Sequence, residues 1–146
     1  MKNILITGGS RGIGKEIVKT CHKNNFKVHF TYSNNLFSAK KILDELNSEN
    51  VSFSQCNLNS YDDIKKLFKN IKKRFDFLDG LVNNAGVSGG IVSIKDFSKK
   101  IIDEVFETNV KGLIHCCKES IPIMSKNNGA RGGSIVNISS MASTIG

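Results

Sequence analysis

The stretch "TGGSRGIGKE", Thr7 to Glu16, decides the fold class, because it joins an apolar run to a helical pattern. The preceding run "NILIT" is short and apolar, which is typical of a parallel strand buried on both faces. The segment that follows has a helix face marked by Ile13, Ile17, Val18 and Cys21. Glycines at such a junction let the backbone approach a phosphate, whose charge is met by free N–H groups and the helix dipole. The stretch therefore predicts a phosphate-binding loop.

The rest of the chain repeats the alternation of strand and helix. Apolar or alternating runs predict further strands at "FKVHFTY", "VSFSQ", "LDGLVN" and "SIVNIS", with helical periodicity between them and a long periodic segment over residues 97–124. Such alternation is typical of right-handed βαβ units, which form a parallel sheet with helices on both faces. We predict a single Rossmann-type doubly wound α/β domain over residues 1–146, with the strand order 3-2-1-4-5.

Composition excludes several classes of protein. The net charge of +8 comes largely from lysines, and the densest run, "IKKLFKNIKKR", places them mostly on the solvated side of a helix. No aromatic residues interleave them as a stacking platform would require, so we expect no nucleic-acid partner. The four cysteines show no paired C-x-x-C spacing, which argues against a metal site. No apolar run approaches the length of a membrane span or signal peptide, and we expect a cytoplasmic protein with reduced thiols.

Three glycine-rich patterns compete for the opening loop. Read as "GSRGIGKE", it nearly fits the nucleotide-hydrolase loop G-x-x-x-x-G-K-[ST], but Glu16 stands where a hydroxyl must reach magnesium. The dinucleotide fingerprint G-x-G-x-x-G fails as well, because Ile17 stands where the third glycine belongs. The pattern T-G-x-x-x-G-x-G does fit, at Thr7, Gly8, Gly12 and Gly14.

This pattern is followed by "NNAG" at residues 83–86, by an asparagine in the long helix and by "IVNISS" at residues 135–140. In this order the motifs resemble the short-chain dehydrogenase/reductase family over the whole chain. The resemblance implies an NAD(P)-dependent oxidoreductase that interconverts a carbonyl and an alcohol of a small molecule by hydride transfer. It also implies two sets of cofactor residues. One surrounds the pyrophosphate and adenosine ribose and the other flanks the nicotinamide: Gly8, Ser10, Arg11, Gly12, Ile13 and Gly14, then Asn84, Ala85 and Gly86.

The end of the second predicted strand indicates which nicotinamide cofactor is preferred. NAD enzymes usually place an acidic residue there to accept from the ribose 2′-hydroxyl. This chain has Tyr32 and Ser33 instead, and Arg11 can pair with a 2′-phosphate. We therefore predict NADP, with NAD and a merely surface-exposed Arg11 as the alternatives. By the resemblance, Asn57 and Leu58 lie at the adenine, with Asn57 in place of the family's common aspartate.

Two catalytic residues are implied by the resemblance. Ser140, or Ser139 next to it, matches the serine that orients the substrate oxygen at the end of the fifth strand. Asn109 matches the asparagine that supports a proton-relay water. Val105, Phe106 and Leu113 put Asn109 on an apolar helix face, where its side chain must find a partner. A strand-terminal serine and a backbone-bonded asparagine are the purely structural alternatives.

The family's tyrosine and lysine, in a Y-x-x-x-K motif, are expected downstream of the serine, but the sequence stops six residues after Ser140. Tyr61 and Lys65 also spell Y-x-x-x-K, yet they follow the third strand, far from Ser140 in the expected strand order. We therefore expect a sheet that is incomplete at its C-terminal side and a chain that is inactive alone, as an N-terminal portion or a truncated product. The full-length form is expected to be a homo-oligomer. A sugar, a steroid-like alcohol and an acyl thioester remain open as substrates, and a non-catalytic nucleotide-binding protein is the alternative.

Overall fold

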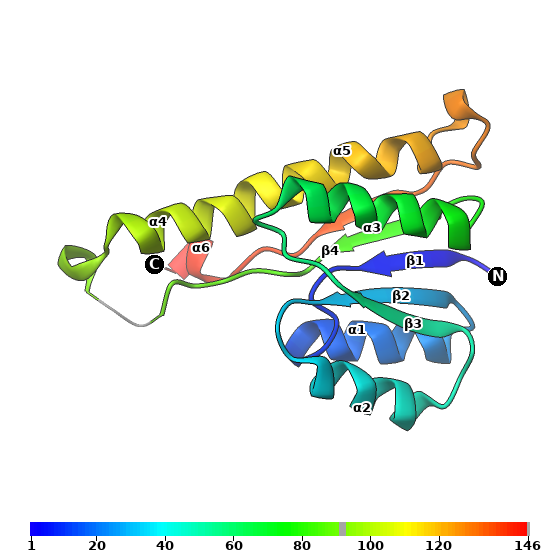
Figure 1. The fold of residues 1–146 in the computed structure, drawn as a ribbon, viewed down its shortest axis with the longest axis horizontal. Coiled ribbons are helices and arrows are strands. Elements are labelled where there is room, and N and C mark those ends of the chain that lie inside the picture. Colours follow the sequence, from blue (N-terminus) through cyan, green and yellow to red (C-terminus); the bar gives the residue numbers. More distant parts are fainter. Residues whose placement is uncertain (91–92, 146) are drawn as a thin grey trace.

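A parallel five-stranded sheet forms the centre of the computed structural model, which describes residues 1–90 and 93–145 (Figure 1). Its strands are β1 Asn3–Ile6, β2 Lys27–Tyr32, β3 Val51–Gln55, β4 Gly80–Asn83 and β5 Ser134–Asn137. They lie in the order β3-β2-β1-β4-β5, and every neighbouring pair is parallel. The predicted fold class and strand order are thus confirmed. Because all five strands run in one direction, their carboxyl ends share one edge of the sheet.

Helices cover both faces of the sheet (Figure 1). One face carries α1 Gly12–Lys23 and α2 Leu36–Leu46. The other carries α3 Tyr61–Arg74 and a long helical segment built from α4 Lys99–Phe106, η2 Glu107–Gly112 and α5 Leu113–Met124. The remaining turns are short: η1 Ile94–Asp96, η3 Lys126–Asn128 and α6 Ala142–Ile145. Within the described part of the chain, every helix is too short or too polar to span a bilayer.

The two faces have separate hydrophobic cores, because successive side chains of a strand point to opposite sides. Leu5 of β1 packs into the core beneath α3 and α5, whereas its neighbours Ile4 and Ile6 pack into the core beneath α1 and α2. Ile13, in the first turn of α1, is 66% exposed and belongs to neither core, whereas Ile17, Val18 and Cys21 of the same predicted helix face pack in the core beneath α1 and α2.

The long periodic segment over residues 97–124 forms a nearly continuous helix, as its pattern predicts, but its middle turn, η2, is π-helical. Gly112 ends this turn against the loop after β3, where a Cβ atom would lie only 2.8 Å from the carbonyl oxygen of Leu58. The expected apolar face is only partly buried. Asn109 is half-buried, whereas Phe106 is 58% exposed.

Candidate functional site

Thr7 joins the glycine-rich loop to the loop after β4, although the two are distant in sequence. Its fully buried hydroxyl oxygen accepts hydrogen bonds from the main-chain N–H groups of Asn84 and Ala85, both at 3.1 Å. The Asn84 side chain also binds the glycine-rich loop: its Nδ2 donates to the carbonyl oxygens of Thr7 at 3.0 Å and Gly8 at 3.1 Å. On the other side, the loop is held to β2 by a hydrogen bond from Gly9 N to the Thr31 carbonyl oxygen, 2.9 Å long. The loop is therefore tied to both neighbouring strands.

The glycines of this loop serve two different purposes. Gly8 and Gly12 adopt φ angles of +66° and +53°, which favour glycine because it lacks a Cβ atom. Gly14 instead leaves room for its neighbours. A Cβ there would lie 2.3 Å from the carbonyl oxygen of Gly8 and 2.4 Å from Asn84 Nδ2. The first turn of α1 can thus approach the loop closely, which brings its N–H groups to the carboxyl edge of the sheet.

The start of α1 is suited to an anion. Within the described residues, no side chain caps this helix end, so its first N–H groups remain open to a ligand. Arg11 stands at the N-cap position and is exposed. Lys15 turns away from the loop and pairs with Glu45 of α2 at 3.1 Å. This contact agrees with the rejection of the nucleotide-hydrolase pattern, in which the lysine must reach phosphate.

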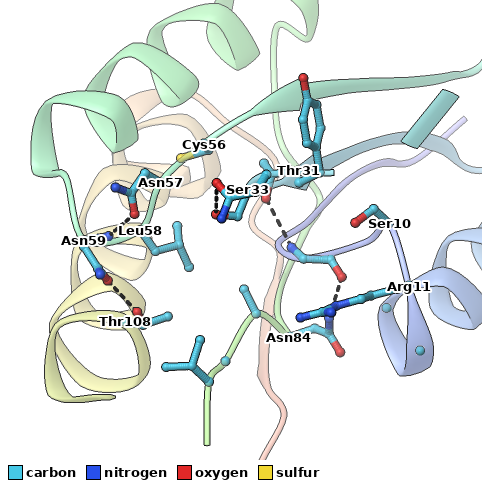
Figure 2. Close-up of a pocket in the computed structure, with 18 of the residues that line it drawn as sticks. Ser10, Arg11, Thr31, Ser33, Cys56, Asn57, Leu58, Asn59, Asn84 and Thr108 are labelled. Carbon is cyan, nitrogen blue, oxygen red and sulfur yellow. Dashed lines mark hydrogen bonds between the residues drawn. The ribbon is translucent and has the colours of Figure 1, made fainter. Parts of the chain in front are cut away.

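A cavity of about 620 Å³ opens at this edge of the sheet, between the glycine loop and the loops after β2, β3 and β4 (Figure 2). All residues predicted to bind the cofactor line it: Gly8, Ser10, Arg11, Gly12, Ile13, Gly14, Tyr32, Ser33, Asn57, Leu58, Asn84, Ala85 and Gly86. Ile13 is exposed because it belongs to this lining. The structure therefore brings the predicted set together around one space.

Seven lining residues were not predicted: Thr31, Asn34, Cys56, Asn59, Val87, Glu104 and Thr108. Most of them adjoin a predicted residue in sequence, so widening each predicted segment by one position would have found them. Glu104 is different, because it lies five positions before Asn109 in α4 and reaches the cavity only through the packing of the long helix. No local pattern in the sequence indicates that placement.

The cavity is polar but carries few charges. Among the described lining residues, only Arg11 and Glu104 belong to the formally charged residue types. Burial, with a smaller effect of the Asp63 carboxylate, raises the pKa of the Cys56 thiol to about 12. Cys56 thus remains a neutral thiol and forms part of the wall. The part of the chain that the structure describes holds no group of three or more metal-ligating side chains.

The two predicted catalytic residues lie outside the cavity lining. Asn109, in η2, makes two hydrogen bonds with the main chain of Val87: Oδ1 accepts from Val87 N at 2.9 Å, and Nδ2 donates to Val87 O at 2.7 Å. Ser140 is exposed after β5, and its Oγ accepts from Ala142 N at 3.2 Å. The segment after β5 reaches the same end of the sheet as the loops that line the cavity (Figure 1). Asn109 thus supports a cavity wall, and Ser140 lies at the same edge.

Tyr61 and Lys65 belong to a different surface. The Tyr61 hydroxyl donates to Glu119 Oε1 at 2.7 Å and accepts from Lys118 Nζ at 2.9 Å, and both partners lie in α5. The Lys65 ammonium lies 5.0 Å from the centre of the Tyr61 ring. This Y-x-x-x-K sequence therefore serves the packing of α3 against α5, which agrees with its rejection as a catalytic motif.

These features define a Rossmann-type α/β protein with a ligand cavity at the carboxyl edge of its sheet. Residues 2–146 match the family model described as short chain dehydrogenase, and the chain belongs to that family.

Similar proteins agree with this placement. The chain is 32% identical over 147 residues to the 3-oxoacyl-(acyl-carrier-protein) reductase FabG of Staphylococcus aureus, with 99% of this chain and 58% of the relative covered. It is 38% identical over 144 residues to (+)-borneol dehydrogenase 2 of Salvia officinalis, covering 97% of this chain and 50% of that protein. A short chain dehydrogenase from Burkholderia cenocepacia, solved in complex with NADP, superposes with a TM-score of 0.88 at 26% identity, covering 99% and 58% of the two chains. The chain thus spans 50% to 58% of the length of these relatives.

Proposed function

We propose that this chain forms the cofactor-binding part of an NADP-preferring oxidoreductase that interconverts a carbonyl and an alcohol. One observation carries the proposal: the cofactor residues predicted from sequence all line one cavity at the end of the sheet. The family membership adds to it, because two relatives are by name a reductase and a dehydrogenase.

The residues present fit a dinucleotide. Gly14 leaves a space that a Cβ atom would fill, and the uncapped start of α1 offers N–H groups to a pyrophosphate. In the proposed complex, the glycine loop holds the pyrophosphate, Asn57 and Leu58 hold the adenine, and Ala85 and Gly86 flank the nicotinamide. When bound, the cofactor supplies or accepts the hydride. The protein's own contribution is to bind and orient it in a cavity between fixed loops.

The preference for NADP rests on the charges near the end of β2. Tyr32, Ser33 and Asn34 line the cavity there and offer no carboxylate to repel a 2′-phosphate. Arg11 also lines the cavity, and its guanidinium makes no ion pair with a carboxylate of the described residues. A free guanidinium matches a phosphate in both charge and geometry. The complex of the Burkholderia cenocepacia relative with NADP points in the same direction.

For the reaction itself, we assign Ser140 to the substrate and Asn109 to the cavity wall. A hydroxyl at the end of β5 can donate a hydrogen bond to a substrate oxygen. Asn109 holds Val87, and through it the nicotinamide side of the cavity. In this proposal, proton transfer depends on the family's Y-x-x-x-K pair, to which no described residue is assigned. The substrate is a small carbonyl compound or alcohol, and a 3-oxoacyl thioester is a specific candidate because of the reductase relative.

The decisive experiment compares NADPH and NADH binding to Arg11→Ala by isothermal titration calorimetry. Loss of a charge-assisted pair should weaken NADPH binding about tenfold or more and leave NADH nearly unchanged. Lys15→Ala is the matched control, because it removes the same charge from the same helix at a side chain that pairs with Glu45. It should bind both cofactors as the unmodified chain does. Equal weakening of NADPH and NADH in Arg11→Ala would refute the NADP preference, and no binding of either cofactor to the unmodified chain would refute the function.

A further inference from the structure

The π-helical turn η2 contacts two walls of the cavity through consecutive residues. Thr108 lines the cavity, and its hydroxyl donates a hydrogen bond to Asn59 Oδ1 in the loop after β3. Asn109 is bonded on both sides of its amide to the main chain of Val87, in the segment after β4. Figure 2 shows the Thr108–Asn59 contact on the side of the cavity opposite Ser10 and Arg11. One helical turn therefore contacts both the adenine wall, which is residues 57–59, and the nicotinamide wall, which is residues 85–87.

The end of η2 also packs closely against the loop after β3. A Cβ atom on Gly112 would lie 2.8 Å from the Leu58 carbonyl oxygen and 2.9 Å from its Cβ. Leu58 lines the cavity and is buried. The helix thus touches the loop after β3 at two points, a hydrogen bond at Thr108 and a close backbone contact at Gly112.

At the start of this loop, Cys56 N donates to the Tyr32 carbonyl oxygen of β2 at 2.9 Å, but the bonds of the following residues are local. Asn59 N donates to Asn57 Oδ1 at 3.1 Å, and Ser60 N donates to the Asn57 carbonyl oxygen at 3.0 Å. These bonds shape a turn but do not set its distance from the rest of the cavity. Within the described residues, the hydrogen bond that joins residues 57–60 to a distant element is the one from Thr108. Thr108 is therefore the side chain that ties the middle of this loop to the long helix, beyond the anchor at Cys56.

We propose that Thr108 is a positioning residue for the cofactor, acting through Asn59 to hold the adenine wall at a fixed distance from Val87. This inference rests on the proposed function, because it concerns the same cavity. Thr108 and Asn109, adjacent in the π-helical turn, make hydrogen bonds with two different loops. Walls that are already fixed lose less conformational entropy when the dinucleotide binds, which favours binding.

The test measures binding of NADPH and of the fragment 2′-phospho-ADP-ribose to Thr108→Val and Thr108→Ser. Valine keeps the shape but removes the donor, so both ligands should bind about two- to tenfold more weakly, the usual net effect of one hydrogen bond. Serine keeps the hydroxyl and should restore affinity, which a loss of packing alone would not explain. Thr20→Val, an exposed threonine on α1 away from the cavity, is the matched control and should bind normally.

A double-mutant cycle with Asn59→Ala separates positioning from direct contact. If Thr108 acts through Asn59, the double variant should lose no more affinity than either single variant. Additive losses would overturn the proposal, and so would normal binding by Thr108→Val. If that variant does not fold, Asn59→Ala breaks the same contact from the loop side, and its normal affinity for both ligands would overturn the proposal. Absence of NADPH binding to the unmodified chain would refute the proposed function, and the inference with it.

Discussion

Replacing Thr7 by valine should remove the side-chain hydrogen bonds by which Thr7 joins the glycine-rich loop to the loop after β4. Valine has nearly the same shape but cannot accept the two hydrogen bonds that the Thr7 oxygen receives from Asn84 N and Ala85 N, both 3.1 Å long. Thr7 is fully buried, and both contacts are part-buried, so water cannot easily replace the lost acceptor. At about 1–2 kcal/mol for each N–H group, the free energy of unfolding should fall by about 2–4 kcal/mol.

Urea unfolding of Thr7→Val and Thr7→Ser measures this loss directly. Serine keeps the oxygen and loses only a methyl group, which costs about 1 kcal/mol, so it should be the more stable of the two variants. Hydrogen exchange locates the effect, because the Asn84 and Ala85 amides should exchange faster in the valine variant and near-normally in the serine variant. Equal stability of the two variants, or unchanged exchange at both amides, would show that the Thr7 oxygen does not join these loops.

Two further predictions test the loop and the sheet. Gly14→Ala should weaken NADPH binding and lower the free energy of unfolding by about 1–3 kcal/mol, because its Cβ would overlap Gly8 O and Asn84 Nδ2. Calorimetry measures the binding, and urea unfolding measures the stability. Unchanged affinity and stability in this variant would contradict the close approach at Gly14. Burial, and secondarily the charge of Arg74, lowers the pKa of His29 to about 4 from 6.5. The unfolded chain then binds a proton more readily, so about 3 kcal/mol of stability should be lost as the pH falls from about 6.5 to 4. His29→Gln should show a flatter pH profile in urea unfolding, and a profile as steep as that of the unmodified chain would contradict this origin.

Much of the site was predictable because its residues follow strands. Parallel strands bring their carboxyl ends to one edge, so the segments after β1, β2, β3 and β4 must meet once the strand order is known. The family resemblance named Gly8, Asn57 and Asn84, and the strand order explains why these residues and Ser33 line one cavity. Their roles toward a cofactor stay predictions until binding is measured.

The features that escaped prediction depend on contacts between distant segments. The π-helical turn lies inside a segment with ordinary helical periodicity, and its contact with Leu58 comes from the packing of the helix on the loop after β3. Thr108 and Asn59 are 49 positions apart, and neither belongs to a recognisable motif.

The contacts also explain why the glycine-rich loop and "NNAG" occur together in this chain. Asn84 Nδ2 lies where a side chain on Gly14 would be, so a larger residue at position 14 would displace the asparagine. The same Nδ2 holds the carbonyl oxygens of Thr7 and Gly8, and the Thr7 hydroxyl holds the main chain after β4. The two motifs are thus joined by four hydrogen bonds, and the N–H groups at the start of α1 have no side-chain cap from Arg11. A change in either motif should therefore alter phosphate binding and the stability of the sheet edge together.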